Sequence, residues 1–150
     1  MKILATNKRA YYDYEILEKY QAGLVLSGAE VKSIKKGRIN LKGSYIIIDK
    51  NQQTWLINCH IAPYPPASAI QKNYNPTQNR KLLLHKKESY SLIGELQQKS
   101  LTALPLKVYT KNGLIKIEIA VAKGKKKWDK KELIKKREIE RKIRERMKEY

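Results

Sequence analysis

The sequence predicts a mainly β protein, a small antiparallel barrel with flanking helices, followed by a basic C-terminal tail. Three observations support this prediction. Short segments rich in β-branched and aromatic residues recur between turn signals across residues 1–122. Within that region, two segments combine helical apolar spacing with signals for a helix start or stop. Residues 123–150, by contrast, are dominated by charge.

The chain carries a large positive charge that is unevenly distributed. Its 150 residues include 33 Lys and Arg against 14 Asp and Glu, a formal net charge of +19. Residues 1–122 hold 19 basic and 8 acidic residues, whereas residues 123–150 hold 14 and 6. The composition changes where an apolar strand gives way to a lysine-rich segment. We therefore expect a folded domain of residues 1–122 and a separate tail of residues 123–150.

Composition also limits the class of protein. Hydrophobic residues make up 41% of the chain, enough for a modest core. No apolar run approaches the ~18 residues of a membrane span, and residues 1–10 lack the apolar stretch of a signal peptide. We therefore expect a cytoplasmic protein with no membrane partner. The one cysteine, Cys59, excludes an intramolecular disulfide. Nucleic acid is the partner that such a positive charge favours.

A short helix is expected between two early strands. Residues 12–16 alternate between apolar and polar side chains, which predicts extended structure. Ser27 and Glu30 have the spacing of a capping box, in which each side chain accepts a backbone N–H of the other residue. Gly37 can end the helix. The sequence therefore predicts a helix over residues 28–36.

A strand pair, a loop and a second helix are expected next. Residues 39–48 and 54–61 are rich in β-branched and aromatic side chains and flank a polar turn, which is typical of a hairpin. Residues 62–79 carry four of the five prolines, so we expect a mobile loop there. A helix fits residues 85–99, where three apolar side chains share one side.

The clearest local signal is the hairpin turn at Asn112-Gly113. This dipeptide favours positive φ at both central residues, and a two-residue turn makes paired positions sum to 225. Leu106 then faces Ile119 on an apolar side. The opposite side is expected to present these residues to solvent: Lys107, Tyr109, Lys111 and Lys116. RNA bases stack on exposed rings beside cations, although a solvated hairpin face is the alternative. Together the strands best fit an OB-like barrel.

The tail is expected to differ physically from the barrel. Its apolar positions are sparse, and its Glu-to-basic pairs four residues apart contribute only ~0.2–0.5 kcal/mol each. We therefore expect it to be disordered when free and helical on an anionic surface. Trp128 lies among six lysines in residues 123–131, a pattern that suits RNA contact. Packing of this ring back onto the barrel is the alternative.

Nothing in the sequence indicates catalysis or a cofactor. The residues that most often support such chemistry, Cys59, His60, His85 and Asp129, form no recognised catalytic or metal-binding spacing. We therefore expect no catalytic residue, metal or cofactor, and a nuclease using His85 or His60 is a weaker alternative. Glu30 has two interpretations: a helix cap, or an acceptor for a base edge or ribose hydroxyl.

Several short motifs follow one another along almost the whole chain. They include Asn7-Lys8-Arg9-Ala10, Gly28–Ile34, Trp55–Asn58, Arg80–His85, Lys111-Asn112-Gly113 and Ala122–Lys126 with Asp129-Lys130. In this combination and order they resemble the SmpB family, the SsrA-binding proteins that partner transfer-messenger RNA (tmRNA). The resemblance covers both the predicted barrel and the start of the tail. The tail beyond Lys131 matches the family in character rather than letter by letter.

The resemblance implies an OB-type barrel and a role in trans-translation, the rescue of stalled ribosomes. A protein of this kind would be an adaptor, monomeric when free, that binds the tRNA-like domain of tmRNA and delivers it to the ribosome. Its tail would occupy the decoding centre of the small subunit and the empty mRNA channel, becoming helical there. The alternative is a ribosome-associated structural RNA-binding protein with a basic extension.

The residues expected to contact RNA come from basic motifs, the hairpin and the resemblance. They are Asn7, Lys8, Arg9, Glu30, Lys32, Arg80, Lys81, Leu83, His85, Lys107, Tyr109, Lys111 and Lys116. The resemblance alone assigns the following to the decoding centre: Gly124, Lys125, Lys126, Trp128, Asp129, Lys130 and Lys131. Two of these depart from the family pattern. Trp128 stands where His or Tyr is common, and Lys131 replaces an Arg and its planar guanidinium.

Overall fold

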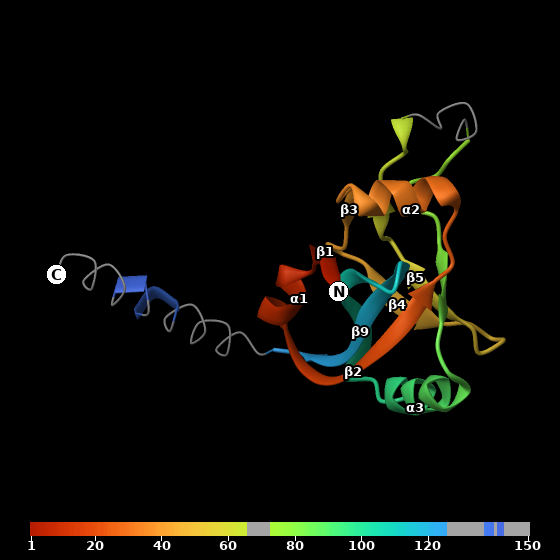
Figure 1. Cartoon of the computed structure of the whole chain (residues 1–150). Coiled ribbons are helices and arrows are strands. Elements are labelled where there is room, and N and C mark those ends of the chain that lie inside the picture. Colours follow the sequence, from red (N-terminus) through yellow and green to blue (C-terminus); the bar gives the residue numbers. More distant parts are fainter. Residues whose placement is uncertain (66–72, 126–136, 140, 143–150) are drawn as a thin grey trace.

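Six antiparallel strands pair in a closed ring. The computed structural model describes residues 1–65, 73–125, 137–139 and 141–142 (Figure 1). Its elements are β1 (Lys2–Thr6), α1 (Lys8–Asp13), β2 (Tyr14–Leu24), α2 (Gly28–Lys35), β3 (Ile39–Asn40), β4 (Tyr45–Ile48), β5 (Thr54–Ile57), β6 (His60–Ile61), β7 (Arg80–Leu83), α3 (Lys86–Leu96), β8 (Leu101–Lys111) and β9 (Leu114–Gly124). The ring runs β8–β4–β5–β7–β2–β9 and returns to β8. The mainly β fold with flanking helices is thus confirmed.

Neighbouring strands of the ring pair over very different numbers of residues. β8 and β9 pair from Leu101 opposite Lys123 to the turn, and β2 pairs with β9 over most of its length. By contrast, β4 meets β8 at Ile46 and Ala103, and β7 meets the end of β2 in two residue pairs. β1 adds to β8 outside the ring, while β3 and β6 form a separate small sheet. In Figure 1, α2 and α3 lie at opposite ends of the barrel.

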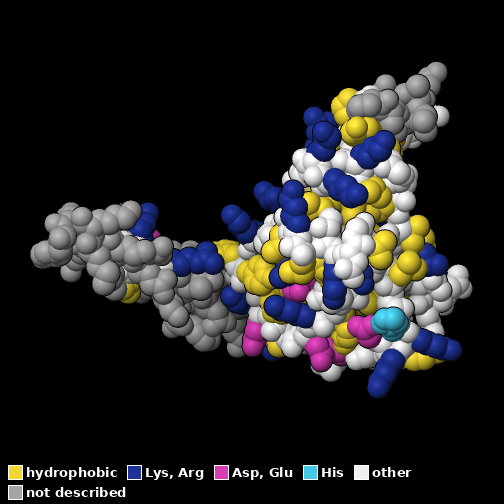
Figure 2. All heavy atoms as spheres, viewed as in Figure 1, with side chains coloured by type: hydrophobic (Ala, Val, Ile, Leu, Met, Phe, Trp, Pro, Cys, Tyr) yellow, Lys and Arg dark blue, Asp and Glu magenta, His cyan; other side chains and the backbone are white. Residues whose placement is uncertain are grey.

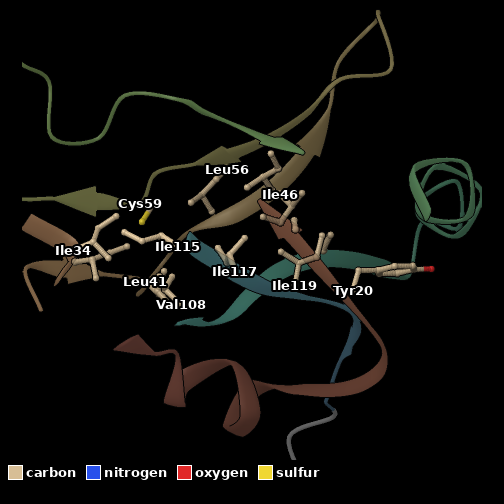
Figure 3. Close-up of a cluster of buried hydrophobic side chains, with 14 of the residues drawn as sticks. Tyr20, Ile34, Leu41, Ile46, Leu56, Cys59, Val108, Ile115, Ile117 and Ile119 are labelled. Atoms are coloured by element: carbon tan, nitrogen blue, oxygen red, sulfur yellow. The ribbon is translucent and has the colours of Figure 1, made fainter. Parts of the chain in front are cut away.

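Aliphatic side chains from the strands fill the interior of the ring (Figure 3). Val108 from β8, with Ile117 and Ile119 from β9, is fully buried. Ile34 of α2 and Leu92 of α3 belong to the same cluster, so each helix contributes a buried side chain to the core. Burial of one such side chain contributes about 1.5–3 kcal/mol, which explains why two short helices stay attached to the barrel.

Local signals in the sequence locate α2 and the last hairpin correctly. The Ser27 hydroxyl accepts the Glu30 backbone N–H at 3.2 Å, and the Glu30 carboxylate accepts the Ser27 N–H at 3.1 Å. The capping box is therefore confirmed. Gly37 follows the helix with a φ of 75°, as expected for a stop. Asn112 and Gly113 both have positive φ, and the predicted register holds from there as far as Lys107 opposite Glu118.

The predicted pairing of Leu106 with Ile119 is wrong. The register shifts between Pro105 and Lys107, so that Pro105 stands opposite Ile119. Proline lacks the N–H that a ladder bond requires, and an extra residue beside it relieves the mismatch. Leu106 itself is buried in a second apolar cluster, with Ala10 of α1 and Ala122 of β9.

The first predicted strand region contains an unexpected helix. Residues 12 and 13 belong to α1 rather than to extended structure, and the strand begins at Tyr14. The Asn7 side chain starts this helix because its Oδ1 accepts the Ala10 N–H at 3.3 Å. The Asn7 amide also donates to the Pro105 carbonyl at 2.9 Å, which ties the helix start to β8.

Other boundaries differ because turns divide the predicted strands. Residues 39–48 form β3 and β4 on either side of a turn that contains Gly43 with φ of 76°. Residues 54–61 form β5 and β6, separated at Asn58 with φ of 59°. α3 is shorter than expected and ends at Leu96, with His85 as its N-cap. Residues 66–72 of the predicted loop lie outside the described residues.

Two glycine substitutions test the hairpin turn against a matched helix site. Gly113 has a φ of 77°, and open space surrounds its Cβ direction, so Gly113→Ala imposes backbone strain without a clash. We expect this change to lower the free energy of unfolding by about 1–2 kcal/mol. Gly94 lies within α3 with equal space around it, and Gly94→Ala should raise that free energy by about 0.5–1 kcal/mol. Urea unfolding measures both, and equal shifts in one direction would contradict the turn geometry.

Candidate nucleic-acid interface

The residues predicted to contact RNA separate into exposed side chains and buried ones. Lys8, Arg9, Lys32, Leu83, His85 and Lys111 are exposed, and Lys81, Lys107 and Lys116 are partly exposed. Asn7, Glu30, Arg80 and Tyr109 are buried. The exposed side chains can contact a polyanion directly, whereas the buried side chains form contacts within the protein.

Arg80 and Glu30 form a buried ion pair between β7 and α2. Nε and Nη2 of Arg80 lie 2.8 and 2.7 Å from Oε2 of Glu30, and the two side chains are 1% and 3% exposed. Arg80 also donates to the carbonyls of Cys59 and Pro76 and to the Tyr74 hydroxyl. A buried charge is costly unless it is paired and hydrogen-bonded, and here each of the three guanidinium nitrogens has an acceptor.

The Glu30 carboxylate is equally well supplied with donors. Besides Arg80 and the Ser27 N–H, the Gln78 amide donates to it at 3.3 Å, and the Tyr74 hydroxyl lies 3.1 Å away. Burial would raise the pKa of Glu30, but these hydrogen bonds and the Arg80 charge outweigh it and hold that pKa below its usual range. Burial and the nearby Glu30 charge raise the pKa of Tyr74 to about 12, so its hydroxyl stays protonated.

This network gives Glu30 an internal role. It caps α2 and connects that helix to β7 and to residues 73–79, whose Tyr74 hydroxyl also lies 2.9 Å from the Ile61 carbonyl. The burial favours the helix-cap interpretation of Glu30 over direct contact with a base edge. Tyr74 and Gln78 could not be identified from the sequence, because both lie in a polar, proline-rich segment with no periodic pattern to single them out.

Tyr109 is not on the surface, so the predicted exposure of this ring is wrong. It is 4% exposed, and its hydroxyl donates to the Gln21 side chain of β2. β1 pairs along β8 and places Ile3 opposite Tyr109. β1 thus extends the sheet beside β8, while the contact that holds the Tyr109 hydroxyl comes from β2. A base cannot stack on a ring in this position.

Lys107 on the same hairpin faces a buried carboxylate. Glu118 is 7% exposed, and the Nζ atoms of Lys107 and Lys19 lie 3.8 and 3.7 Å from its oxygens. The Gln21 amide also donates to Glu118 at 3.1 Å. Glu118 therefore offsets part of the positive charge there, and the exposed Lys111 near the turn is better placed to meet a phosphate.

Exposed cations concentrate on α2 and the segment after it. Lys32, Lys35, Lys36 and Arg38 are all exposed, although the sequence analysis selected Lys32 alone. In Figure 2, Lys and Arg side chains are spread over this end of the molecule, whereas Asp and Glu gather towards the other end. A row of lysines on one helix is the signal that could have identified the rest of this surface.

A groove of about 310 Å³ lies between the β4–β5 turn and the start of α3. Its lining combines cationic, aromatic and apolar side chains, among them Lys81, Leu83, Lys86 and Tyr90. Tyr90 is 55% exposed and Leu83 is 54% exposed, so both present apolar surface to solvent. Such a groove can hold an unstacked base against a ring while lysines meet the adjoining phosphates. It includes two of the predicted residues from the Arg80–His85 motif.

The start of the tail contacts α1. Lys125 donates its backbone N–H to the Asp13 carbonyl at 2.9 Å and its ammonium to the Tyr11 carbonyl at 3.1 Å. Of the seven residues assigned to the decoding centre, Gly124 and Lys125 are described. Lys126, Trp128, Asp129, Lys130 and Lys131 lie outside the described residues. Residues 137–139 and 141–142 are helical and exposed.

No cluster of three or more His, Cys, Asp or Glu that could hold a metal ion occurs in the described part of the chain. The same residues include no helix that is long and apolar enough to cross a membrane. Burial raises the pKa of the Cys59 thiol to about 11, so this side chain stays protonated at neutral pH.

The model of the "SmpB protein" family matches residues 4–149. The chain belongs to the SmpB family. It is 53% identical to the SsrA-binding protein of Sulfurihydrogenibium sp. (strain YO3AOP1), an alignment that covers 95% of this chain and 91% of that protein. It is 50% identical to the SsrA-binding protein of Caldicellulosiruptor saccharolyticus over all of this chain and 93% of that one.

A solved structure shares this fold. A chain from "tmRNA-SmpB: a journey to the center of the bacterial ribosome" aligns with a TM-score of 0.68 and 44% sequence identity. The alignment covers 82% of this SmpB family member and 85% of the solved chain. The resemblance inferred from the sequence motifs is thus confirmed.

Substitution of Arg80 tests how strongly the interface depends on the buried ion pair. Arg80→Ala leaves the Glu30 carboxylate buried without its cation, and we expect the free energy of unfolding to fall by about 3–5 kcal/mol. Lys81→Ala, the neighbouring but partly exposed control, should change it by less than about 1 kcal/mol. Urea unfolding of the two variants makes the comparison. A similar small loss for both would contradict the structural importance assigned to the pair.

The pH dependence of stability tests the Glu30 environment. Its pKa in the folded protein lies below the ordinary value, so its ionised form stabilises the fold. This contribution is complete above the ordinary pKa of a glutamate and is lost as the pH falls through the lower folded value. We expect the difference in unfolding free energy between the wild type and Glu30→Gln to shrink as a neutral sample is acidified. A difference that stays constant throughout acid titration would contradict this assignment.

Proposed function

We propose that this protein is the RNA-binding adaptor of trans-translation. In this role the barrel binds the tRNA-like domain of tmRNA and delivers that RNA to stalled ribosomes. The tail then occupies the decoding centre and the empty mRNA channel. The main support is family membership across residues 4–149, because proteins about half identical over nearly the whole chain are named for binding SsrA, which is tmRNA.

The surface of the barrel suits a structured RNA. Exposed lysines on α2 can neutralise phosphates along a backbone, a contribution that holds the RNA without reading its sequence. The groove beside β7 and α3 adds apolar and aromatic surface for a base that is not stacked in a helix. Beneath both surfaces, the Arg80–Glu30 pair connects β7 to α2. The two contact regions therefore keep a fixed relation to each other.

We further propose that the protein has no reaction of its own and works in the cytoplasm. Its relatives are named for binding an RNA rather than for a chemical conversion. The similar solved chain comes from a study of tmRNA and SmpB on the bacterial ribosome. Shape and charge are sufficient for this task, since delivery of one RNA to another particle requires no bond to be made or broken.

Truncation tests the division of work between barrel and tail. A chain ending at Lys125 keeps the described strands and helices of the barrel, so its Kd for the tRNA-like domain should change by less than about threefold at physiological salt. The same truncation should abolish rescue of stalled ribosomes in a reconstituted translation system. Filter binding and peptide-tagging assays measure the two effects.

Other outcomes would contradict this function. Equal loss of RNA binding and rescue on truncation would contradict the proposed division of work. Stoichiometric association with ribosomes that survives a high-salt wash would instead indicate the structural ribosomal component. Cleavage of the RNA by the wild type, lost in His85→Ala or His60→Ala, would indicate a nuclease.

A further inference from the structure

We propose that Lys125 is a positioning residue that fixes the start of the tail against α1. The resemblance places this lysine among the residues of the decoding centre, but in the structure its ammonium is used within the protein. The inference concerns the free protein first. Its consequence for ribosome rescue rests on the function proposed above.

Strand register brings Lys125 to the end of α1. β9 pairs with β2 to its last residue, which places Gly124 opposite Tyr14 and Lys123 opposite Glu15. Tyr14 directly follows α1, so the residue after Gly124 necessarily arrives at the last turn of that helix. The position of Lys125 is therefore set by β2 and β9, two of the three longest strands of the barrel, and not by the tail.

Two hydrogen bonds then hold Lys125 in place. Its backbone N–H donates to the Asp13 carbonyl at 2.9 Å, and its Nζ donates to the Tyr11 carbonyl at 3.1 Å. Both acceptors lie near the C-terminal end of α1, where carbonyl groups lack partners within the helix and a cation is favoured. The side chain thereby satisfies a carbonyl that α1 itself leaves open.

α1 is a firm support for this contact. Asn7 caps its start and donates to the Pro105 carbonyl of β8, while Ala10 is buried in the second apolar cluster. On its outer side, Arg9 forms an ion pair with Asp13 at 2.9 Å. The helix is thus fixed to the barrel at its start, along its buried side and at its end.

The same helix carries exposed Lys8 and Arg9, two of the predicted RNA contacts. One six-residue element therefore connects a candidate RNA contact to the point where the tail begins. When a binding segment is joined to an anchored domain, its effective concentration at its target depends on the distance between the attachment point and that target. Fixing Lys125 would hold the point where the tail begins at a constant position relative to the bound RNA.

A pair of charge-matched variants tests the contact in the free protein. Lys125→Met removes the ammonium and keeps the length of the side chain, while Lys123→Met removes the same charge from an exposed position two residues earlier, in β9. Amide hydrogen exchange by NMR should be about five- to tenfold faster at residue 125 in Lys125→Met than in the wild type. Lys123→Met should leave that rate unchanged, and Lys125→Arg should retain most of the protection. Equal exchange in both methionine variants would overturn the proposal.

Functional assays then separate positioning from direct contact with the tRNA-like domain. Lys125→Met should bind the tRNA-like domain as Lys123→Met does, yet rescue stalled ribosomes several times more slowly, with recovery in Lys125→Arg. Weaker binding to the isolated RNA in Lys125→Met alone would show that Lys125 is an RNA contact and overturn the proposal. So would equal rescue by the two methionine variants. If the wild type fails to support rescue, the proposed function fails, while the exchange result still decides whether Lys125 holds the tail start.

Discussion

The buried pair of Arg80 and Glu30 connects segments that are distant in the sequence. Glu30 caps α2, and Arg80 begins β7 and reaches the carbonyls of Cys59 and Pro76. Removing two charges from water costs several kcal/mol each, and this cost is offset only where every donor and oxygen is satisfied. Here every nitrogen of the guanidinium and both oxygens of the carboxylate have partners, which are side chains and backbone groups from four parts of the chain. The cationic surface of α2 and the groove beside β7 both depend on it.

A chain with a net charge of +19 must also manage repulsion among its own cations. The barrel places two of its few carboxylates inside, Glu30 beside Arg80 and Glu118 near Lys19 and Lys107. Each offsets positive charge where the dielectric constant is low and the effect is largest. The lysines of α2 stay in water, where repulsion between them is screened by salt. The distribution of acids thus lets a cationic surface and a stable interior coexist.

Features that depend on residues close together in the sequence could be predicted, whereas features that depend on residues far apart in the sequence could not. The α2 capping box and the Asn112-Gly113 turn involve neighbours within a few residues, and both were predicted correctly. Leu106 was misplaced because the register shifts beside Pro105. Tyr109 was misplaced because its ring is buried and its hydroxyl donates to Gln21 of β2, far away in the sequence. The partners of Glu30 could not be predicted, since Tyr74, Gln78 and Arg80 reach it only after the chain has folded. The cationic character of the site was visible from composition, but its buried framework was not.

The unequal strand pairing has a mechanical consequence. Within the single seven-stranded sheet, β4, β5 and β7 form one part and β1, β8, β9 and β2 form the other, joined at Ile46–Ala103 and at the end of β2. Few main-chain hydrogen bonds cross these two seams, so we expect thermal fluctuations to open the barrel there first. β7 and the β4–β5 turn on one side of the groove belong to the smaller part, whereas α3 on its other side packs against β8 and β9 of the larger part, as does α1 against β8. A slight hinge movement along the seams would let one half adjust to a curved ligand while the other keeps its shape.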